Sequence, residues 1–156
     1  MNIRKATIDD AQTLSALNVD VQRIHANALP HIFKQPESAN FALEVMTERL
    51  SEPSNHFFIA QIDGEAVGYI FARVVERPEN PFMFAWTYIY IDQISVKPMH
   101  QKRGIGKLLI DEVLVLANAK GIETVALDTW TFNNQALSFF KKQGFVPFNE
   151  RLWLIE

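Results

Sequence analysis

Two glycines, with two basic residues directly before them, make the segment 101–107 the part of this chain best suited to binding a ligand. The segment reads Gln-Lys-Arg-Gly-Ile-Gly-Lys and lies between a predicted strand and a predicted amphipathic helix. The first backbone N–H groups of a helix have no partner inside the helix, and the helix dipole favours an anion there. Glycine lacks the Cβ that would keep a ligand away from the backbone. The segment therefore predicts a pyrophosphate-binding helix start, with Lys102 and Arg103 beside it.

The size and composition of the chain are typical of one folded domain. Its 156 residues, 48% of them hydrophobic, fit a single domain spanning residues 1–156. The net charge of −3 and the pI of about 5.8 argue against nucleic-acid binding, which usually requires a basic surface. We therefore expect no nucleic-acid partner.

Several classes of site are excluded by the residues that the chain lacks. The sequence contains no cysteine, which excludes disulfides, a thiolate nucleophile and a cysteine-based metal site. The four histidines are scattered, so we expect no metal. No apolar run approaches the roughly 18 residues of a membrane span, and the N-terminus lacks the apolar core of a signal peptide. We expect a cytoplasmic protein with no membrane partner.

Hydrophobic periodicity and turn residues predict strands and helices along the whole chain. Strands are predicted at residues 2–6, 57–62, 65–75, 84–96, 124–130, 145–146 and 151–155, and helices at 7–28, 37–50, 104–120 and 133–143. Hairpins occupy the first half and strand–helix units the second. The simplest packing is an α/β fold, with helices on both faces of a mixed sheet.

The long strand at 84–96 changes its pattern halfway along. Ile89 and Ile91 share one face of an ideal strand, whereas Ile94 and Val96 share the other. A β-bulge near Asp92 would insert one residue, restore a single apolar face and leave backbone groups free for a ligand. The alternative is a strand buried on both faces, for which alternation carries no information.

Two motifs at this point resemble those of the GCN5-related N-acetyltransferase (GNAT) superfamily. The first is Ile94-Ser95-Val96 followed by Gln101-Lys102-Arg103-Gly104-Ile105-Gly106. The second is Asn133-Asn134-Gln135-Ala136 followed by Phe139-Phe140-Lys141-Lys142-Gln143-Gly144-Phe145. The resemblance implies a mostly antiparallel central sheet of about seven strands, with a splayed pair at 84–96 and 124–130 and four helices on both faces.

The resemblance also implies acetyl-CoA as the cofactor and a set of residues that bind it. Backbone N–H groups would hold the pyrophosphate, namely those of Gln101, Lys102, Arg103, Gly104, Ile105, Gly106 and Lys107. The strand segment Ile94-Ser95-Val96 would pair through its backbone with the pantetheine arm. Asn133 would hydrogen-bond that arm, and Ala136, Phe139 and Phe140 would lie beside the CoA. The acetyl group would pass to a primary amine by direct attack in a ternary complex.

The sequence departs from the family pattern at Phe140, where many relatives carry a tyrosine that protonates the CoA thiolate. Three alternatives follow. Water or another donor supplies the proton, Tyr88 or Tyr90 takes over the role, or the protein is an acyl-CoA-binding sensor with little catalysis. General acid catalysis commonly contributes about 10²–10⁴-fold, so its loss need not abolish activity.

The resemblance also implies a catalytic base at the predicted bulge and an acceptor site walled in part by the end of the first helix and the loop after it. Asp92 is the candidate base, and its alternative role is to accept hydrogen bonds from unpaired amides at the bulge. Candidate acceptor contacts are His25, His31, Trp86 and Trp130, for which an exposed histidine or core packing is the alternative. The acceptor would be a small-molecule or protein amine. The resemblance also makes a homodimer possible, with the strand at 151–155 adding to a partner's sheet.

Overall fold

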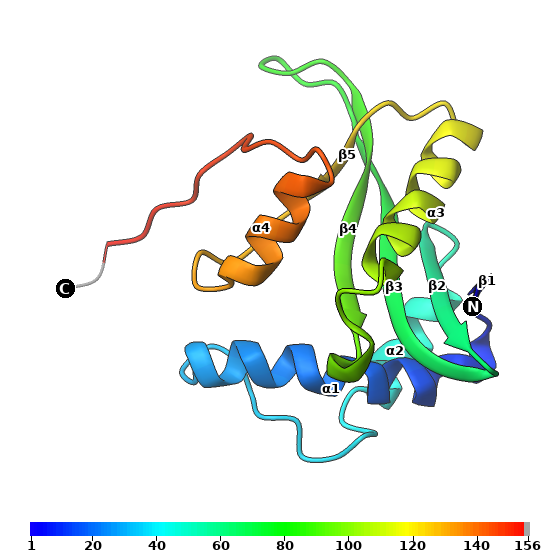
Figure 1. Ribbon diagram of the computed structural model, residues 1–156. Coiled ribbons are helices and arrows are strands. Elements are labelled where there is room, and N and C mark those ends of the chain that lie inside the picture. Colours follow the sequence, from blue (N-terminus) through cyan, green and yellow to red (C-terminus); the bar gives the residue numbers. More distant parts are fainter. Residues whose placement is uncertain (155–156) are drawn as a thin grey trace.

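A single sheet with strand order β1-β2-β3-β4-β5 forms the centre of the computed structural model, which describes residues 1–154 (Figure 1). The strands are β1 (Asn2–Lys5), β2 (Asn55–Ile62), β3 (Glu65–Arg77), β4 (Trp86–Val96) and β5 (Val125–Leu127). The helices are α1 (Ala11–Ala28), α2 (Leu43–Ser51), α3 (Ile105–Ala119) and α4 (Asn134–Lys142), with short 3₁₀ turns η1 (Ile8–Asp10) and η2 (Pro98–His100). Strands β1 to β4 are antiparallel, and β5 is parallel to β4.

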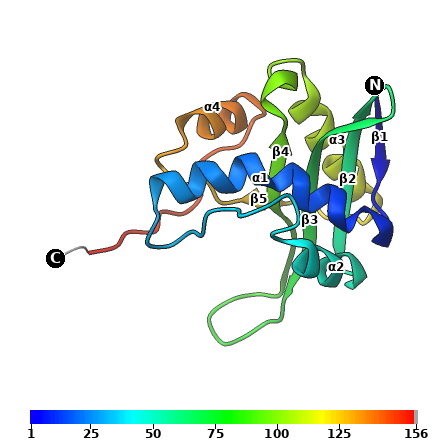
Figure 2. The same ribbon diagram turned by 90° about the horizontal axis from the view of Figure 1, so that it is seen from below.

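Helices cover both faces of the sheet, as the sequence predicts. On one face, Leu14 of α1 and Met46 of α2 pack in one buried cluster with Tyr69 and Phe71 of β3. On the opposite face, α3 and α4 contribute to a second cluster with strand residues that include Ile70, Ile89 and Ile91. Figure 2 shows α1 crossing in front of the strands and α3 behind them. The mixed α/β fold class is therefore confirmed.

The bulge predicted in the long strand is present at Asp92. Phe71 of β3 pairs with Gln93, whereas the next residue, Ala72, pairs with Ile91, so Asp92 is the extra residue of β4. Ile91 and Ile94 consequently face the same α3-side cluster despite their odd spacing. The prediction is confirmed, and it explains the change of parity in the sequence.

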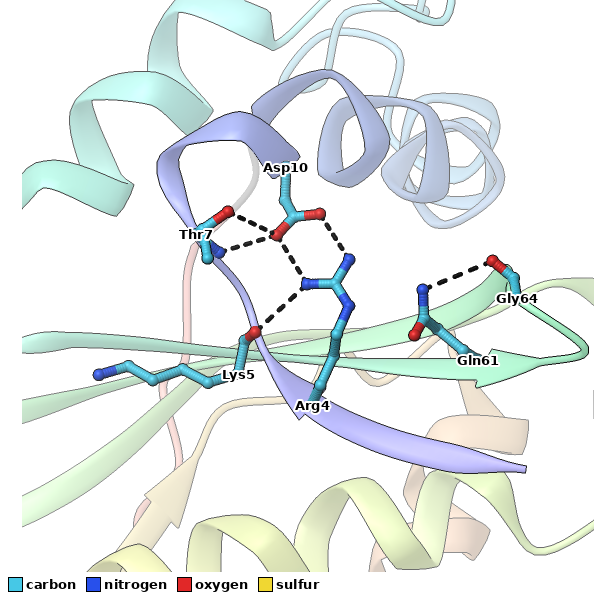
Figure 3. A network of polar contacts seen from close by, with 6 residues as sticks. All are labelled: Arg4, Lys5, Thr7, Asp10, Gln61 and Gly64. Atoms are coloured by element: carbon cyan, nitrogen blue, oxygen red, sulfur yellow. Dashed lines mark hydrogen bonds and ion pairs between the residues drawn. The ribbon is translucent and has the colours of Figure 1, made fainter.

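An ion pair anchors β1 to the start of α1 (Figure 3). The Arg4 guanidinium donates to both Asp10 carboxylate oxygens, at 2.8 and 2.7 Å, and the Thr7 backbone N–H donates to Asp10 Oδ2 at 2.8 Å. These hydrogen bonds hold the pKa of Asp10 below its ordinary value of 3.8, with the Arg4 bond the main cause. The contact fixes the strand-to-helix connection at the edge of the sheet.

Several predicted boundaries are wrong. The second helix begins at Leu43 rather than at 37, β4 begins at Trp86 rather than at 84, and β5 is limited to Val125–Leu127. No strand forms among residues 145–154, and residue 155 lies outside the described residues. In that segment Val146 and Leu152 are 79% and 87% exposed. Strand-forming residues make a strand only where a neighbouring strand and a buried face are available, which is why both C-terminal strand predictions are wrong.

Candidate active site

The edge of β4 opens where the bulge begins. On one side β4 pairs with β3 from Trp86 to Val96, but on the other side β5 pairs only with Ile89–Ile91. From Asp92 onward, no strand among residues 1–154 covers this second edge. The expected splay is therefore present, and the exposed backbone edge ends next to the glycine segment that starts α3.

A cleft of about 260 Å³ lies beside this edge, between α1, β4, β5 and α4. Four expected CoA-binding residues line it: Ile94, Asn133, Ala136 and Phe140. The candidate base Asp92 and the acceptor candidates His25 and Trp130 line it as well. The fold thus brings together residues that lie more than 100 positions apart in the sequence.

The start of α3 presents backbone donors without acceptors. Gly104 is the N-terminal cap with a φ of 81°, a left-handed conformation that glycine adopts without strain, and no side chain caps the helix. Its carbonyl accepts from the N–H of Leu108 at 3.1 Å. Within the described residues, the N–H groups of Ile105, Gly106 and Lys107 have no acceptor. These three donors fit a diphosphate.

The basic side chains and Gln101 of this segment have distinct environments. Lys102 and Arg103 are exposed, and Arg103 approaches the His100 ring at 3.2 Å. The Gln101 backbone N–H donates to the Pro98 carbonyl, and its side chain donates to the Val96 carbonyl at 2.9 Å. Gln101 therefore ties the loop to β4, and its expected backbone contact with pyrophosphate gains no support.

Gly106 allows α3 and α4 to approach each other. A Cβ at Gly106 would lie 2.9 Å from Cζ of Phe139, closer than real Cβ contacts. Phe139 therefore covers the first turn of α3. The glycine at this position leaves room for the Phe139 ring as well as access to the backbone, and a larger residue would require the ring to move.

Asn133 and Ser95 are already engaged by the fold. Asn133 caps α4, and its Oδ1 accepts from the N–H of Ala136 at 3.1 Å, which leaves its Nδ2 donor for the cleft. Ser95 is buried and donates to the Leu17 carbonyl at 2.7 Å. Its side chain therefore fastens β4 to α1, and its backbone pairs with Tyr69 of β3, so the expected contact of Ser95 with CoA gains no support.

Asp92 has an ion-pair partner that the sequence did not indicate. Its carboxylate lies 3.3 Å from Nε of Arg73, and its side chain is 24% exposed. Arg73 in turn lies over the Tyr90 ring, 5.1 Å from the centroid. Within residues 1–154 no backbone N–H donates to Asp92, so its alternative role as an acceptor for bulge amides gains no support.

The two tyrosines proposed as replacement acids occupy different positions. The Tyr90 hydroxyl donates to Asp128 Oδ2 at 2.9 Å, and burial, followed by the contact with Asp128, raises the pKa of Tyr90 to about 12. Tyr88 is buried outside the cleft-lining residues, where it stacks on Trp86 at 4.4 Å and accepts weakly from Arg77. The expected roles of Tyr88 and Trp86 gain no support from these positions.

Of the two candidate histidines, one lines the cleft and the other does not. His31 lines a separate hollow formed by residues 30–35 and 37, and it is not among the residues that line the cleft. His25 joins an aromatic wall of the cleft, with its ring centroid 5.1 Å from Phe33 and 5.8 Å from Phe132. Trp130 lies 5.2 Å from Phe33. Phe33 and Phe132 were missed, because nothing in their local sequence connects them to β5 or α1.

A buried hydrogen-bond chain under the cleft was also missed. The Tyr69 hydroxyl accepts from Asn18 Nδ2 and donates to Gln93 Oε1 at 2.8 Å. Tyr69 is fully buried, and burial raises its pKa above the ordinary tyrosine range. The three residues lie on α1, β3 and β4, so only the folded sheet brings them together.

Comparisons with known proteins agree with this geometry. The sequence pattern described as the acetyltransferase (GNAT) family matches residues 19–145. An N-alpha-acetyltransferase of Sulfolobus acidocaldarius is 28% identical over 148 residues, which cover 92% of this chain and 78% of that protein. The mouse N-acetyltransferase family 8 member 3 is 29% identical over 104 residues, 67% of this chain, but the match spans only 44% of the mouse protein.

Solved structures share the fold at lower sequence identity. The BH1408 protein from Bacillus halodurans superposes with a TM-score of 0.94 at 21% identity, covering 100% of both chains. The aminoglycoside N-acetyltransferase AAC(6')-Iy in complex with CoA superposes with a TM-score of 0.75 at 21% identity, covering 99% of this chain and 93% of that chain. The family match extends over both motifs, the bulge and every residue that lines the cleft except Asn18, and the chain belongs to the acetyltransferase (GNAT) family.

Proposed function

We propose that this protein is an N-acetyltransferase that transfers the acetyl group of acetyl-CoA to a primary amine in a ternary complex. The observation that carries the proposal is the open edge of β4 after Asp92, which leads directly to the unpartnered N–H groups at the start of α3. A backbone edge and a helix start in this arrangement suit an extended arm that ends in a diphosphate. Membership of the GNAT family supports the same reaction.

The chain supplies contacts for the diphosphate and for the pantetheine arm of acetyl-CoA. The diphosphate would accept hydrogen bonds from the N–H groups of Ile105, Gly106 and Lys107, with Lys102 and Arg103 nearby. The pantetheine arm would pair with the open backbone edge at Ile94 and with the N–H of Val96, whose carbonyl accepts from Gln101, within reach of the Asn133 Nδ2 donor. Ala136 and Phe139 would supply apolar contacts.

The reaction needs one proton acceptor and one proton donor. The neutral amine nitrogen attacks the thioester carbonyl carbon, so that a C–N bond forms, the C–S bond breaks, and CoA leaves as a thiolate. Asp92, directly or through a water molecule, takes the proton that the amine loses. Phe140 has no proton to give, and the Tyr90 hydroxyl already donates to Asp128, so water protonates the thiolate.

The second candidate function is an acyl-CoA-binding sensor with little catalysis. The observation that favours it is the position of Phe140, which lines the cleft with a side chain only 7% exposed and offers no acidic group. Replacing Phe140 by tyrosine separates the two candidates. A faster reaction in that variant indicates an enzyme limited by proton donation, whereas an inert variant that still binds CoA favours the sensor.

The acceptor belongs to one of the classes that the similar proteins suggest. Three relatives are named N-alpha-acetyltransferases, and several structural neighbours are aminoglycoside acetyltransferases. Peptide amino termini and amino sugars are therefore the first acceptors to compare.

Release of free CoA from acetyl-CoA tests the proposal directly. Because the chain has no cysteine, a thiol reagent detects only the CoA product. We expect release that depends on an added amine, together with CoA binding in calorimetry. CoA binding without release for any amine would favour the sensor, and no CoA binding would contradict both candidates.

A further inference from the structure

A buried tyrosine holds two amide side chains at the wall of the cleft. The Tyr69 hydroxyl bonds to Asn18 on one side and to Gln93 on the other. Tyr69 itself is fully buried, whereas both amides line the cleft. The tyrosine therefore fixes the orientation of two groups that a ligand can reach.

The single hydroxyl hydrogen of Tyr69 determines what these two amides present. A phenol donates only one hydrogen bond, so one amide meets the hydroxyl with its oxygen and the other with its nitrogen. Gln93 uses its oxygen and Asn18 its nitrogen. The remaining atoms are an NH₂ donor on Gln93 and a carbonyl acceptor on Asn18. If both amides and the Tyr69 hydroxyl hydrogen took the opposite orientation, the donor would lie on Asn18 and the acceptor on Gln93. One donor and one acceptor would still face the cleft.

Both remaining atoms are available to a ligand. Neither Gln93 Nε2 nor Asn18 Oδ1 has a hydrogen-bond partner among the described residues. Among residues 1–154, the one buried side-chain polar atom that has neither solvent contact nor a hydrogen-bond partner is His56 Nε2. Gln93 Nε2 and Asn18 Oδ1 are not in that class, so solvent or a ligand can reach them. The Gln93 and Asn18 atoms are therefore unsatisfied but open to the cleft, next to the candidate base Asp92.

We infer that the acceptor carries an amide group next to its amine, as the amino end of a peptide does. This inference rests on the proposed function. A peptide group offers a carbonyl for the Gln93 donor and an N–H for the Asn18 acceptor, whereas a polyamine has no carbonyl. An amino sugar could satisfy both atoms through hydroxyls, but the aromatic wall of His25, Phe33 and Trp130 favours an apolar substituent over a polyhydroxylated ring.

Two matched amines isolate the contribution of the amide. Phenylalanine N-methylamide and phenethylamine share the aromatic group and the primary amine and differ in the amide, which also lowers the pKa of the neighbouring amine. Their kcat/KM values are therefore compared per concentration of neutral amine. We expect kcat/KM to be at least about 10-fold higher for the amide, because two hydrogen bonds to otherwise unsatisfied groups are gained. Kanamycin and spermidine extend the comparison to the other acceptor classes.

Variants of Tyr69 and Gln93 test whether their hydrogen bonds cause the preference for the amide. Tyr69→Phe removes the shared hydroxyl, and we expect the preference for the amide to fall below about 3-fold, mainly through a higher KM. Gln93→Met removes the donor at a half-buried position and should have the same effect if Tyr69→Phe does not fold. Tyr88→Phe removes a hydroxyl outside the cleft and should keep the wild-type preference.

The outcomes separate this inference from the proposed function. Three outcomes would overturn the inference. They are equal kcat/KM for the two matched amines, a preference for kanamycin or spermidine, and an unchanged preference for the amide in both Tyr69→Phe and Gln93→Met. In each of these cases amine-dependent CoA release still supports the acetyltransferase. No CoA release with any of the four amines contradicts the proposed function, and the inference falls with it.

Discussion

The two edges of strand β4 differ in how completely they pair with a neighbouring strand. Toward β3, β4 is paired along its whole length, and the residues at the centre of β3, Tyr69, Ile70 and Phe71, are at most 2% exposed. Toward β5, the pairing stops after Ile91, and the residues that follow are half-buried around a cleft. The closed side stabilises the fold, whereas the open side keeps hydrogen-bonding groups for ligands. Changes on the two sides should therefore affect different measurements.

The largest effect is expected on the closed side. Leu14 is fully buried between α1 and the sheet, so Leu14→Ala should lower the free energy of unfolding by about 3 kcal/mol through lost burial and a cavity. Urea denaturation measures this change. Ile24→Ala on the same helix is the control, because Ile24 is 48% exposed and should cost less than about 0.5 kcal/mol. Equal costs would contradict a core on this face.

The next effect is expected on the open side and concerns activity. Asp92→Asn should lower kcat/KM about 100-fold at pH 7, because the amine loses its base. The loss should shrink toward pH 9, where more of the amine is already neutral. The unfolding free energy should change by less than about 1 kcal/mol, since the pair with Arg73 is partly exposed. The same loss at every pH would assign Asp92 a structural role.

The ion pair at the edge of the closed side should give a smaller, pH-dependent effect. Asp10→Asn should cost about 2 kcal/mol at pH 7, because a buried carboxylate bonded to Arg4 is replaced by a neutral amide. The folded pKa of Asp10 lies below the unfolded value of 3.8, so its contribution is present above pH 3.8 and is lost as the pH falls through the folded pKa. Wild type and variant should therefore converge in acid. Denaturation at pH 7 and pH 3 measures the difference, and a constant gap would contradict the assignment.

The smallest effect is expected at the start of α4, on the open side. Asn133→Ala should cost about 1 kcal/mol, because the N–H of Ala136 loses its cap. Asn134→Ala is the matched control, since Asn134 is exposed and makes no capping contact. Asn133→Ser keeps a capping oxygen but removes the Nδ2 donor, so it should restore stability while CoA binding in calorimetry remains weaker. Full recovery of CoA affinity in the serine variant would show that Asn133 acts only as a cap.

Much of the fold could be predicted because the relevant signals are local. The change of parity between Ile91 and Ile94 predicted the bulge, and Gly104 marked the start of α3, because each signal depends on neighbours along one element. The C-terminal strands could not be predicted in the same way. A strand depends on a partner that lies elsewhere in the chain, and the segment after α4 runs away from the sheet (Figure 1). Its apolar residues Val146, Phe148, Leu152 and Leu154 remain exposed.

The sequence by itself determined the family motifs, the bulge, the helix start and the residues available for chemistry, because these follow from side-chain type and short-range spacing. Only the tertiary structure decided which residues meet. It paired Asp92 with Arg73, moved Tyr88 out of the cleft and placed Tyr69 between Asn18 and Gln93. Such contacts join three separate elements, and the hydrogen-bonding state of each group is set by partners that no local pattern encodes.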